Sequence, residues 1–155
     1  MLKVQRNEDR VTIETAGAVF EWDAKRGGQI VRCDAKVVDA RHALLSGRTA
    51  VPNLTLILNG KKVSLADVPM ECSILRQDEQ RCEIRMSGRL ADCFTVEQRY
   101  EVYREGVVFC EFGLALDEGK EVNIRTAKMQ FPLDVLSARK AKVGYLSRDP
   151  YPKQD

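Results

Sequence analysis

Histidine is almost absent from this 155-residue sequence, in which His42 is the single example. Catalysis by a Ser/His/Asp or Cys/His arrangement needs an imidazole that takes up and returns a proton. His42 stands apart from the cysteines in the sequence, and a lone histidine near a loop is more often solvated or singly hydrogen-bonded. We therefore predict that the isolated chain is not an enzyme, and we assign no catalytic residue.

Motifs that hold metals, cofactors or phosphate groups are also missing from the sequence. The five cysteines form neither a CxxC pair nor a cysteine/histidine cluster; they are Cys33, Cys72, Cys82, Cys93 and Cys110. No EF-hand, Walker A or GxGxxG sequence occurs. We expect no metal and no other cofactor.

Four of the cysteines share the phase of the apolar residues around them, namely Cys33, Cys72, Cys82 and Cys110. This pattern predicts small buried hydrophobic side chains rather than disulfides. Unpaired cysteines favour a reducing compartment, whereas a trimmed signal peptide would mean a secreted or periplasmic protein.

Long hydrophobic runs and an excess of one charge are missing as well. No apolar run approaches the roughly 18 residues that span a bilayer, and the N-terminal MLKVQRNEDR lacks the hydrophobic segment of a secretory signal. The 25 basic and 23 acidic residues give a net charge of +2 and are interspersed, unlike the charge pattern of a nucleic-acid-binding surface. We expect a soluble chain with neither a membrane nor a nucleic acid as partner.

What the sequence does contain is alternation of apolar and polar residues with a period of two. With 44% hydrophobic residues, a chain of this length is expected to form one hydrophobic core. Strands are predicted at residues 11–15 and 18–23. RGGQI, residues 26–30, predicts a turn, and the next strand would place Val31, Cys33, Ala35 and Val37 on one face.

Residues 39–47, DARHALLSG, are predicted to form a short helix that carries His42. After Ala141 the chain contains two prolines with charged neighbours, as in a linker. We therefore predict a β-sandwich domain at residues 1–140 and an exit linker at residues 141–155 that leads to a further domain or tail.

Two hairpins are predicted in the middle of the chain. Asn59-Gly60 supplies the two positive-φ positions of a type I′ turn. This first hairpin pairs Leu58 with Lys61, Leu56 with Val63 and Leu54 with Leu65. In the second hairpin, a loop at residues 77–81 matches the apolar faces of the two strands, which carry Cys72, Ile74, Cys82, Ile84, Met86 and Leu90.

A third hairpin turns on Arg104-Glu105-Gly106, where Gly106 takes the left-handed position of a three-residue loop. Its predicted core-side pairs are Phe94–Leu116, Val96–Leu114, Tyr100–Cys110 and Val102–Val108. On the other side Arg99 faces Glu111. One register thus gives apolar pairs on one face and a pair of opposite charges on the other, which favours it.

A last strand is predicted at residues 122–133, where Pro132 marks an edge or a strand end. The total is about nine to eleven short strands separated by turn residues, with no alternation of strands and helices. This predicts an all-β fold, an antiparallel β-sandwich.

Sugar binding commonly uses an exposed aromatic ring with planar polar side chains beside it. Five of the aromatic residues fall on core phases (Phe20, Trp22, Phe94, Tyr100 and Phe112) and Phe131 is ambiguous, which leaves Tyr103, Phe109, Tyr145 and Tyr151 as exposed candidates. We predict a carbohydrate-binding site at Arg99, Glu101, Tyr103 and Phe109. The alternative is that Tyr103 packs across strands and that Glu97, Glu101 and Glu111 form a solvated face with Arg99 as counter-charge.

Two stretches, VFEWDAKRGGQIVRC at residues 19–33 and FTVEQRYEVYREGVVFCEFGLAL at residues 94–116, resemble the β-sandwich domains of the galactose-mutarotase-like superfamily. In polysaccharide lyases and glycoside hydrolases of that superfamily, an early strand leads into a GG turn and a later hairpin lies in a large curved sheet. The resemblance is nearest to accessory domains of exo-acting rhamnogalacturonan and pectin lyases. Epimerases of the superfamily use two histidines and a glutamate, a set that this sequence lacks, so the resemblance implies no catalytic residue here.

Two functions are consistent with these observations. The first is a non-catalytic domain of a carbohydrate-active protein, which packs against a polysaccharide-degrading catalytic domain or shapes its cleft. Its partners would be a carbohydrate, with an acidic oligosaccharide as one candidate, or an adjacent domain of the same chain. The alternative is a protein-interaction or structural module without sugar contact, because a fold does not determine a function.

Overall fold

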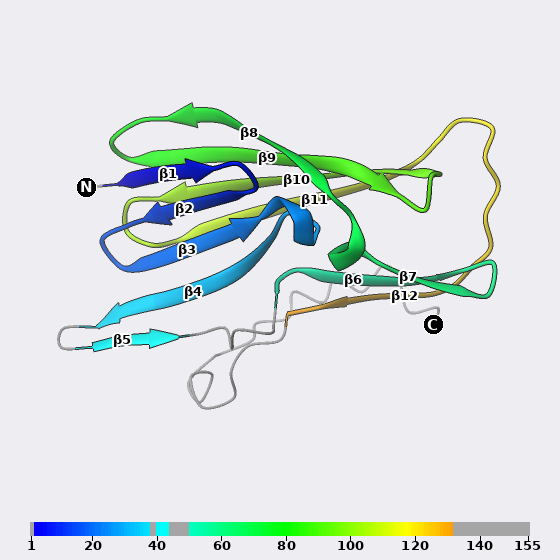
Figure 1. The fold of residues 1–155 in the computed structure, drawn as a ribbon, viewed down its shortest axis with the longest axis horizontal. Coiled ribbons are helices and arrows are strands. Elements are labelled where there is room, and N and C mark those ends of the chain that lie inside the picture. The colour runs from blue at the N-terminus through cyan, green and yellow to red at the C-terminus, as the bar shows by residue number, and fades with distance from the viewer. Residues whose placement is uncertain (1, 38–39, 44–49, 132–155) are drawn as a thin grey trace, which may run out of the picture.

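Strands dominate the computed structural model, which describes residues 2–37, 40–43 and 50–131. Across these residues twelve strands form three antiparallel sheets of five, four and three strands (Figure 1). The described part of the chain contains two short 3-10 helices and no α-helix. The predicted fold class, an all-β antiparallel sandwich, is confirmed.

The five-stranded sheet follows chain order and consists of β1 (Lys3–Asn7), β2 (Arg10–Glu14), β3 (Ala18–Asp23), β4 (Gln29–Val37) and β5 (Ala40–Ala43). The four-stranded sheet has the order β11–β10–β9–β8, with β8 (Met70–Gln77), β9 (Arg81–Leu90), β10 (Phe94–Tyr103) and β11 (Val108–Leu116). The three-stranded sheet has the order β12–β6–β7, with β6 (Asn53–Leu58), β7 (Lys61–Ser64) and β12 (Ile124–Gln130). The 3-10 helices are η1 (Ala24–Arg26) and η2 (Leu65–Asp67).

The five-stranded and four-stranded sheets face each other. Trp22 of β3 meets Tyr100 of β10 edge to face, with 5.5 Å between the ring centroids, and Arg6 of β1 donates to the carbonyl of Cys72 in β8 at 3.0 Å. An isolated backbone bridge between Ile30 and Val51 joins the five-stranded sheet to the segment before β6. At the right of Figure 1, residues 117–123 cross from β11 to the three-stranded sheet.

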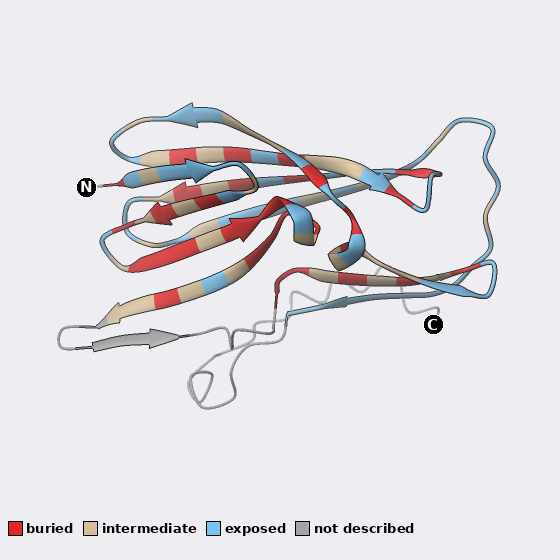
Figure 2. Ribbon diagram, viewed as in Figure 1, coloured by how far each residue is buried: buried red, intermediate tan, exposed pale blue. Residues whose placement is uncertain are grey.

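All three sheets contribute to one hydrophobic core (Figure 2). Alternation of side chains across each strand turns every second residue inward, as the burial of β10 illustrates. The largest fully buried side chains are Trp22, Tyr100, Ile13, Leu56, Leu65, Ile84, Met86, Leu90, Gln29, Gln98, Val11 and Val96. Burial of this apolar surface is the main favourable contribution to folding.

The short helix predicted at residues 39–47 is wrong where the structure describes it. Ala40–Ala43 form β5, which pairs with β4 and places His42 opposite Ala35 in the register. Propensity favoured a helix in this alanine-containing segment, but the unpaired edge of β4 offers backbone hydrogen bonds that a strand can use. Asp39 and residues 44–47 lie outside the described residues.

The first predicted hairpin is correct at its turn and in its first pairs. Asn59 and Gly60 have φ values of 48° and 80°, Leu58 pairs with Lys61, and Leu56 pairs with Val63. The predicted pair of Leu54 and Leu65 does not form, because β7 ends at Ser64. Leu65 instead begins η2, where its side chain is fully buried.

The loop predicted at residues 77–81 for the second hairpin is wrong, since the turn is tighter. Gln77 pairs with Cys82, and the Asp78 N–H donates to the Arg81 carbonyl at 2.9 Å. The register shifts between Ile74 and Arg76. The bulge places one extra residue on β8, so Ile74 still pairs with Ile84 although the turn is shorter than predicted.

The register of the third predicted hairpin is confirmed. The four apolar pairs and the pair of Arg99 with Glu111 all form between β10 and β11. Tyr103 N–H donates to the Val107 carbonyl at 2.9 Å, and Gly106 has a φ of 98°. Of the last predicted strand, Ile124–Gln130 forms β12, whereas Pro132, Leu133, the predicted domain boundary at residue 140 and the exit linker lie outside the described residues.

The RGGQI segment places its two glycines against the four-stranded sheet. Gln98 of β10 donates to the Gly27 carbonyl at 2.6 Å. The Tyr100 hydroxyl donates to Gln98 Oε1 at 2.6 Å and lies 3.2 Å from the Gly28 carbonyl oxygen. Burial raises the pKa of Tyr100 well above its ordinary value, so the phenol keeps its proton.

A side chain at Gly28 is predicted to disrupt this contact. Gly28 has a φ of 62°, and a Cβ there would lie 2.7 Å from Met86 Cβ. We expect Gly28→Ala to lower the free energy of unfolding by about 2 to 5 kcal/mol, from backbone strain plus overpacking. Gly60→Ala is the matched control, because Gly60 has a φ of 80° and open space around it; its cost should be about 1 to 2 kcal/mol. Equal losses in urea denaturation would contradict the packing argument.

Candidate functional site

The outer face of the four-stranded sheet carries all four residues predicted to bind carbohydrate. Arg99, Glu101 and Tyr103 occupy alternate positions of β10, and Phe109 of β11 pairs directly with Glu101. Their neighbours Gln98, Tyr100 and Val102 are buried on the inner face. The alternation of β10 therefore gathers the candidate residues on one surface.

Tyr103 and Phe109 form an aromatic pair on this surface. Their rings meet edge to face, with 5.8 Å between centroids and 82° between planes, a favoured geometry for aromatic pairs. The Tyr103 hydroxyl donates to Glu101 Oε2 at 2.8 Å. Phe109 keeps 62% of its surface exposed, so this ring is held by Tyr103 yet open to solvent.

Carboxylates on neighbouring strands engage two arginines of the same face. Arg81 lies 3.5 Å from Glu101 Oε2, and Arg99 Nε lies 3.1 Å from Glu83 Oε1 on β9. The sequence predicted Glu111 as the residue opposite Arg99, and the register confirms it. The recorded ion pair, however, joins Arg99 to the neighbouring strand β9.

The sequence analysis missed three residues of this face on β9, namely Arg81, Glu83 and Arg85, and among them Arg85 stands out. It is exposed and pairs directly with Arg99 across β9 and β10. Among the described residues no ion pair or hydrogen bond of the Arg85 side chain is recorded. The alternation in RCEIRMSGR would have placed Arg81, Glu83 and Arg85 on one face, so this residue could have been found by continuing the pattern into β9.

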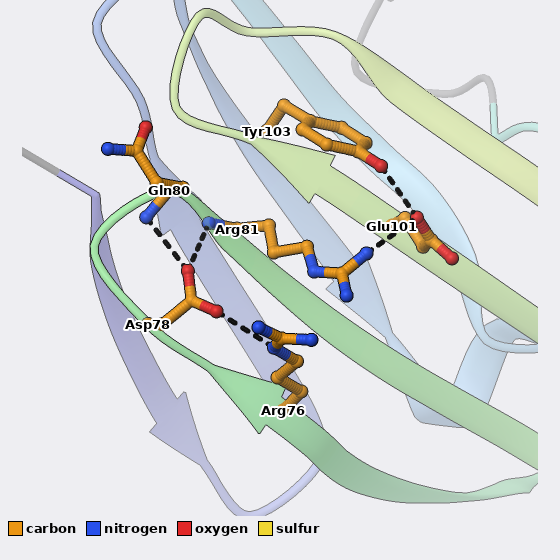
Figure 3. Close-up of polar contacts among 6 residues, drawn as sticks. All are labelled: Arg76, Asp78, Gln80, Arg81, Glu101 and Tyr103. Carbon is orange, nitrogen blue, oxygen red and sulfur yellow. Dashed lines mark hydrogen bonds and ion pairs between the residues drawn. The ribbon is translucent and has the colours of Figure 1, made fainter.

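A shallow hollow of about 510 Å³ lies beside Tyr103. It is lined by Arg76, Asp78, Glu79, Gln80, Arg81 and Tyr103. Figure 3 shows the Arg81 side chain reaching from the β8–β9 turn toward Glu101, whose other recorded contact is the Tyr103 hydroxyl. The aromatic pair and the hollow are thus connected through one chain of polar contacts.

Asp78 holds the β8–β9 turn in place. Its Oδ1 accepts from the backbone N–H groups of Gln80 and Arg81, each at 2.9 Å, and its Oδ2 accepts from Arg76 at 2.8 Å (Figure 3). The two backbone N–H groups, with Arg76 beside them, keep the pKa of the Asp78 carboxyl below its ordinary value. Asp78 is therefore charged at neutral pH.

The described residues of the outer face include no histidine and no cysteine. His42 belongs to β5 of the other large sheet. Burial raises the pKa of the Cys33 and Cys82 thiols to about 11, which disfavours thiolate chemistry. Within residues 2–37, 40–43 and 50–131, no group of three His, Cys, Asp or Glu residues could hold a metal ion.

The cysteines are all free thiols, but one differs from its predicted environment. Cys82 is buried as predicted, whereas Cys33 and Cys72 are only half-buried, although both pack against the core. Cys110 is exposed, so the prediction that it is buried was wrong. It does lie on the inner face, opposite Tyr100, but the described residues leave its side chain exposed there.

No family model matches the sequence, and neither the curated proteins nor the solved structures provide a match. No helix in the described part of the chain is long and apolar enough to cross a membrane. Tyr145 and Tyr151, the other two aromatic candidates, lie outside the described residues. The site is therefore interpreted from its own geometry.

The two faces of β10 are predicted to differ in their contribution to stability. Val96 is fully buried, so Val96→Ala should lower the free energy of unfolding by about 1 to 3 kcal/mol through cavity formation. Arg99→Ala removes a solvent-accessible ion pair and should cost less than about 1 kcal/mol. Chemical denaturation measures both; a loss for Arg99→Ala as large as that for Val96→Ala would contradict this assignment of faces.

The Asp78 turn is predicted to lose its stabilising effect in acid. Because the folded pKa of Asp78 is lowered, the carboxylate stabilises the fold above the ordinary aspartate range, and this stabilisation disappears as the pH falls through the folded pKa. Asp78→Ala should therefore melt at a lower temperature than wild type at neutral pH. When the melting temperature is measured as a function of pH, the values for wild type and Asp78→Ala should converge below the folded pKa of Asp78. A difference that stays constant with pH would contradict a role for the ionised Asp78 carboxylate.

Proposed function

We propose that this chain is a non-catalytic β-sandwich module of a carbohydrate-active protein, and that the outer face around Tyr103 and Phe109 contacts an acidic oligosaccharide. The observation that carries the proposal is the exposed Phe109 ring, held against Tyr103 within a cluster of arginines and carboxylates. The resemblance to galactose-mutarotase-like sandwich domains adds to it.

The aromatic pair supports contact with a sugar ring. A pyranose offers an apolar face to an aromatic ring and hydroxyl groups to planar polar side chains. Phe109 provides the exposed ring, and Glu101 and Arg81 provide polar groups beside it. The edge-to-face contact with Tyr103 limits the motion of Phe109, which lowers the entropy that a ligand must remove.

The arrangement of arginines supports an acidic ligand. Arg85 and Arg99 lie directly opposite each other on β9 and β10, a placement that costs free energy when both charges are left unpaired. Arg99 is balanced by Glu83, whereas Arg85 has no recorded partner among the described residues. A uronate carboxylate bound at Arg85 would supply the missing negative charge through a charge-assisted hydrogen bond.

A binding role fits this surface better than a catalytic one. Glu101 is occupied by the Tyr103 hydroxyl and lies near Arg81, so it is not held as a free acid or base. The described residues of the outer face include no histidine that could transfer a proton. The module would then position a polysaccharide for a catalytic domain elsewhere in a carbohydrate-active protein.

Loss of the exposed ring is predicted to weaken sugar binding without unfolding the chain. Phe109→Ala should reduce the affinity for oligogalacturonate by about three- to tenfold, because the ring contact is lost. Arg85→Ala should weaken binding of the acidic oligomer but not of a neutral oligosaccharide. Isothermal titration calorimetry measures the affinities, and thermal melting verifies the fold.

Arg10→Ala is the matched control for Arg85→Ala. Arg10 is also exposed but belongs to β2 in the other sheet, where it pairs with Glu21, so its removal should leave oligogalacturonate binding unchanged. Unaltered affinity in both Phe109→Ala and Arg85→Ala would refute the proposed sugar surface, as would the absence of any binding by the wild-type chain.

The second candidate function is a protein-interaction module without sugar contact. One observation favours it: Phe112 and Leu114 of β11 are only half-buried, and Leu116 is exposed, although all three lie on the inner side of a sandwich sheet. Uncovered apolar surface of this kind commonly marks a contact with another protein.

A further inference from the structure

Among the described strands, β11 lies at a sheet edge and lacks the protection that edge strands usually carry. It runs for nine residues, VFCEFGLAL, with one charge, no proline and no lysine. Its pairing with β10 contains no register shift. The opposite edge of the same sheet, β8, has a bulge after Ile74 and carries charged residues. Natural sheets blunt long regular edges with such devices because an open edge pairs with other strands.

The unpaired backbone groups of β11 can be assigned from the hairpin itself. At one end Tyr103 N–H donates to the Val107 carbonyl, and at the other Asp117 N–H donates to the Cys93 carbonyl, each at 2.9 Å. Hydrogen-bonded pairs alternate along an antiparallel ladder, so the intervening odd-numbered residues of β11 point their backbone groups toward β10. The even-numbered residues point theirs to the free edge; they are Val108, Cys110, Phe112, Leu114 and Leu116.

The side chains of these edge residues form an apolar stripe on the inner face. Their partners on β10 are buried, including Val96, Tyr100 and Val102. The stripe itself is half-buried or exposed along its whole length, as Figure 2 shows for β11. The stripe therefore combines backbone groups that have no strand partner among the described residues with apolar side chains that the core covers only in part.

We propose that two copies of this chain pair through β11, antiparallel and about a twofold axis at Phe112, so that the two four-stranded sheets become one continuous sheet. The proposal does not depend on sugar binding. It leaves the outer face, with Tyr103 and Phe109, open to solvent.

The sequence of β11 matches itself in this register. Pairing about Phe112 places Val108 opposite the partner's Leu116 and Cys110 opposite the partner's Leu114, so the apolar stripes are continuous. These are even-numbered residues, whose backbone groups are the free ones. On the outer side Glu111 faces the partner's Gly113, so no like charges meet. A twofold axis at Glu111 would instead place the two Glu111 carboxylates opposite each other, so the axis at Phe112 is the one that matches apolar residues and keeps like charges apart.

The first test is the mass of the chain in solution. Sedimentation equilibrium between about 1 and 100 µM should show a monomer–dimer equilibrium. Amide hydrogen exchange should slow at Cys110, Phe112 and Leu114 as concentration rises, because their N–H groups would become bonded. A monomer throughout this range would overturn the proposal. It would do so also if the reason were that another segment of the same chain pairs with β11.

Two substitutions of opposite charge at Gly113 test the register of the proposed dimer. A Cβ at Gly113 has its nearest neighbour, the Glu97 carbonyl oxygen, at an ordinary 3.7 Å. Gly113→Arg would face the partner's Glu111 and should tighten the dimer, whereas Gly113→Glu should weaken it, each by about two- to thirtyfold for the two symmetric contacts. Equal dimer affinities of the two variants would overturn the register.

A matched pair of leucine variants tests the surface itself. Leu116 of β11 and Leu75 of the opposite edge strand are 42% and 43% exposed. Leu116→Lys should raise the dimer dissociation constant by about tenfold or more, because a charge would be buried against the partner's Val108, and Leu75→Lys should leave it unchanged. A dimer weakened equally by both, or by Leu75→Lys alone, would place the interface elsewhere.

Discussion

The close approach of the Gly27-Gly28 turn to the four-stranded sheet is the constraint on which the rest of this structure depends. A Cβ at Gly27 would lie 2.2 Å from the Leu65 carbonyl oxygen, and one at Gly28 would meet Met86. The two glycines therefore let three segments that are distant in sequence share one contact. Gln98 and Tyr100 satisfy the buried carbonyls of the turn, which would otherwise be costly to bury.

This internal contact also determines which residues reach the surface. Because Gln98 and Tyr100 must face inward, Arg99, Glu101 and Tyr103 must face outward. The candidate sugar surface is thus the reverse side of the strand that anchors the core. A strand fixed in this way is a rigid support, and rigid support is what allows Tyr103 and Phe109 to hold a defined edge-to-face geometry.

β11 contributes to three different surfaces: the outer face of the sheet, its inner face and its backbone edge. Its odd-numbered side chains, such as Phe109, belong to the outer face, and its even-numbered side chains belong to the inner face. Its other backbone edge pairs with no strand in the described part of the chain. A sugar ligand and a second copy would use different sides of the strand. The two proposals are therefore compatible, and failure of one leaves the other standing.

Local patterns were sufficient where a short turn connects paired strands. Asn59-Gly60 and the Gly106 loop each determine a register, since a tight turn leaves the chain no freedom to slip. The shared face of the four carbohydrate-site candidates followed from the alternation in β10 and β11. The features decided by tertiary structure are those that depend on a distant neighbour. β1 was not predicted because Val4 is its one residue that is not exposed. Ala40–Ala43 became a strand because β4 offered an edge, and the bulge after Ile74 replaced a longer loop.

Cys110 has the phase of a buried residue but is exposed. Alternation along a strand determines which way a side chain points, whereas burial depends on whether another layer lies above it.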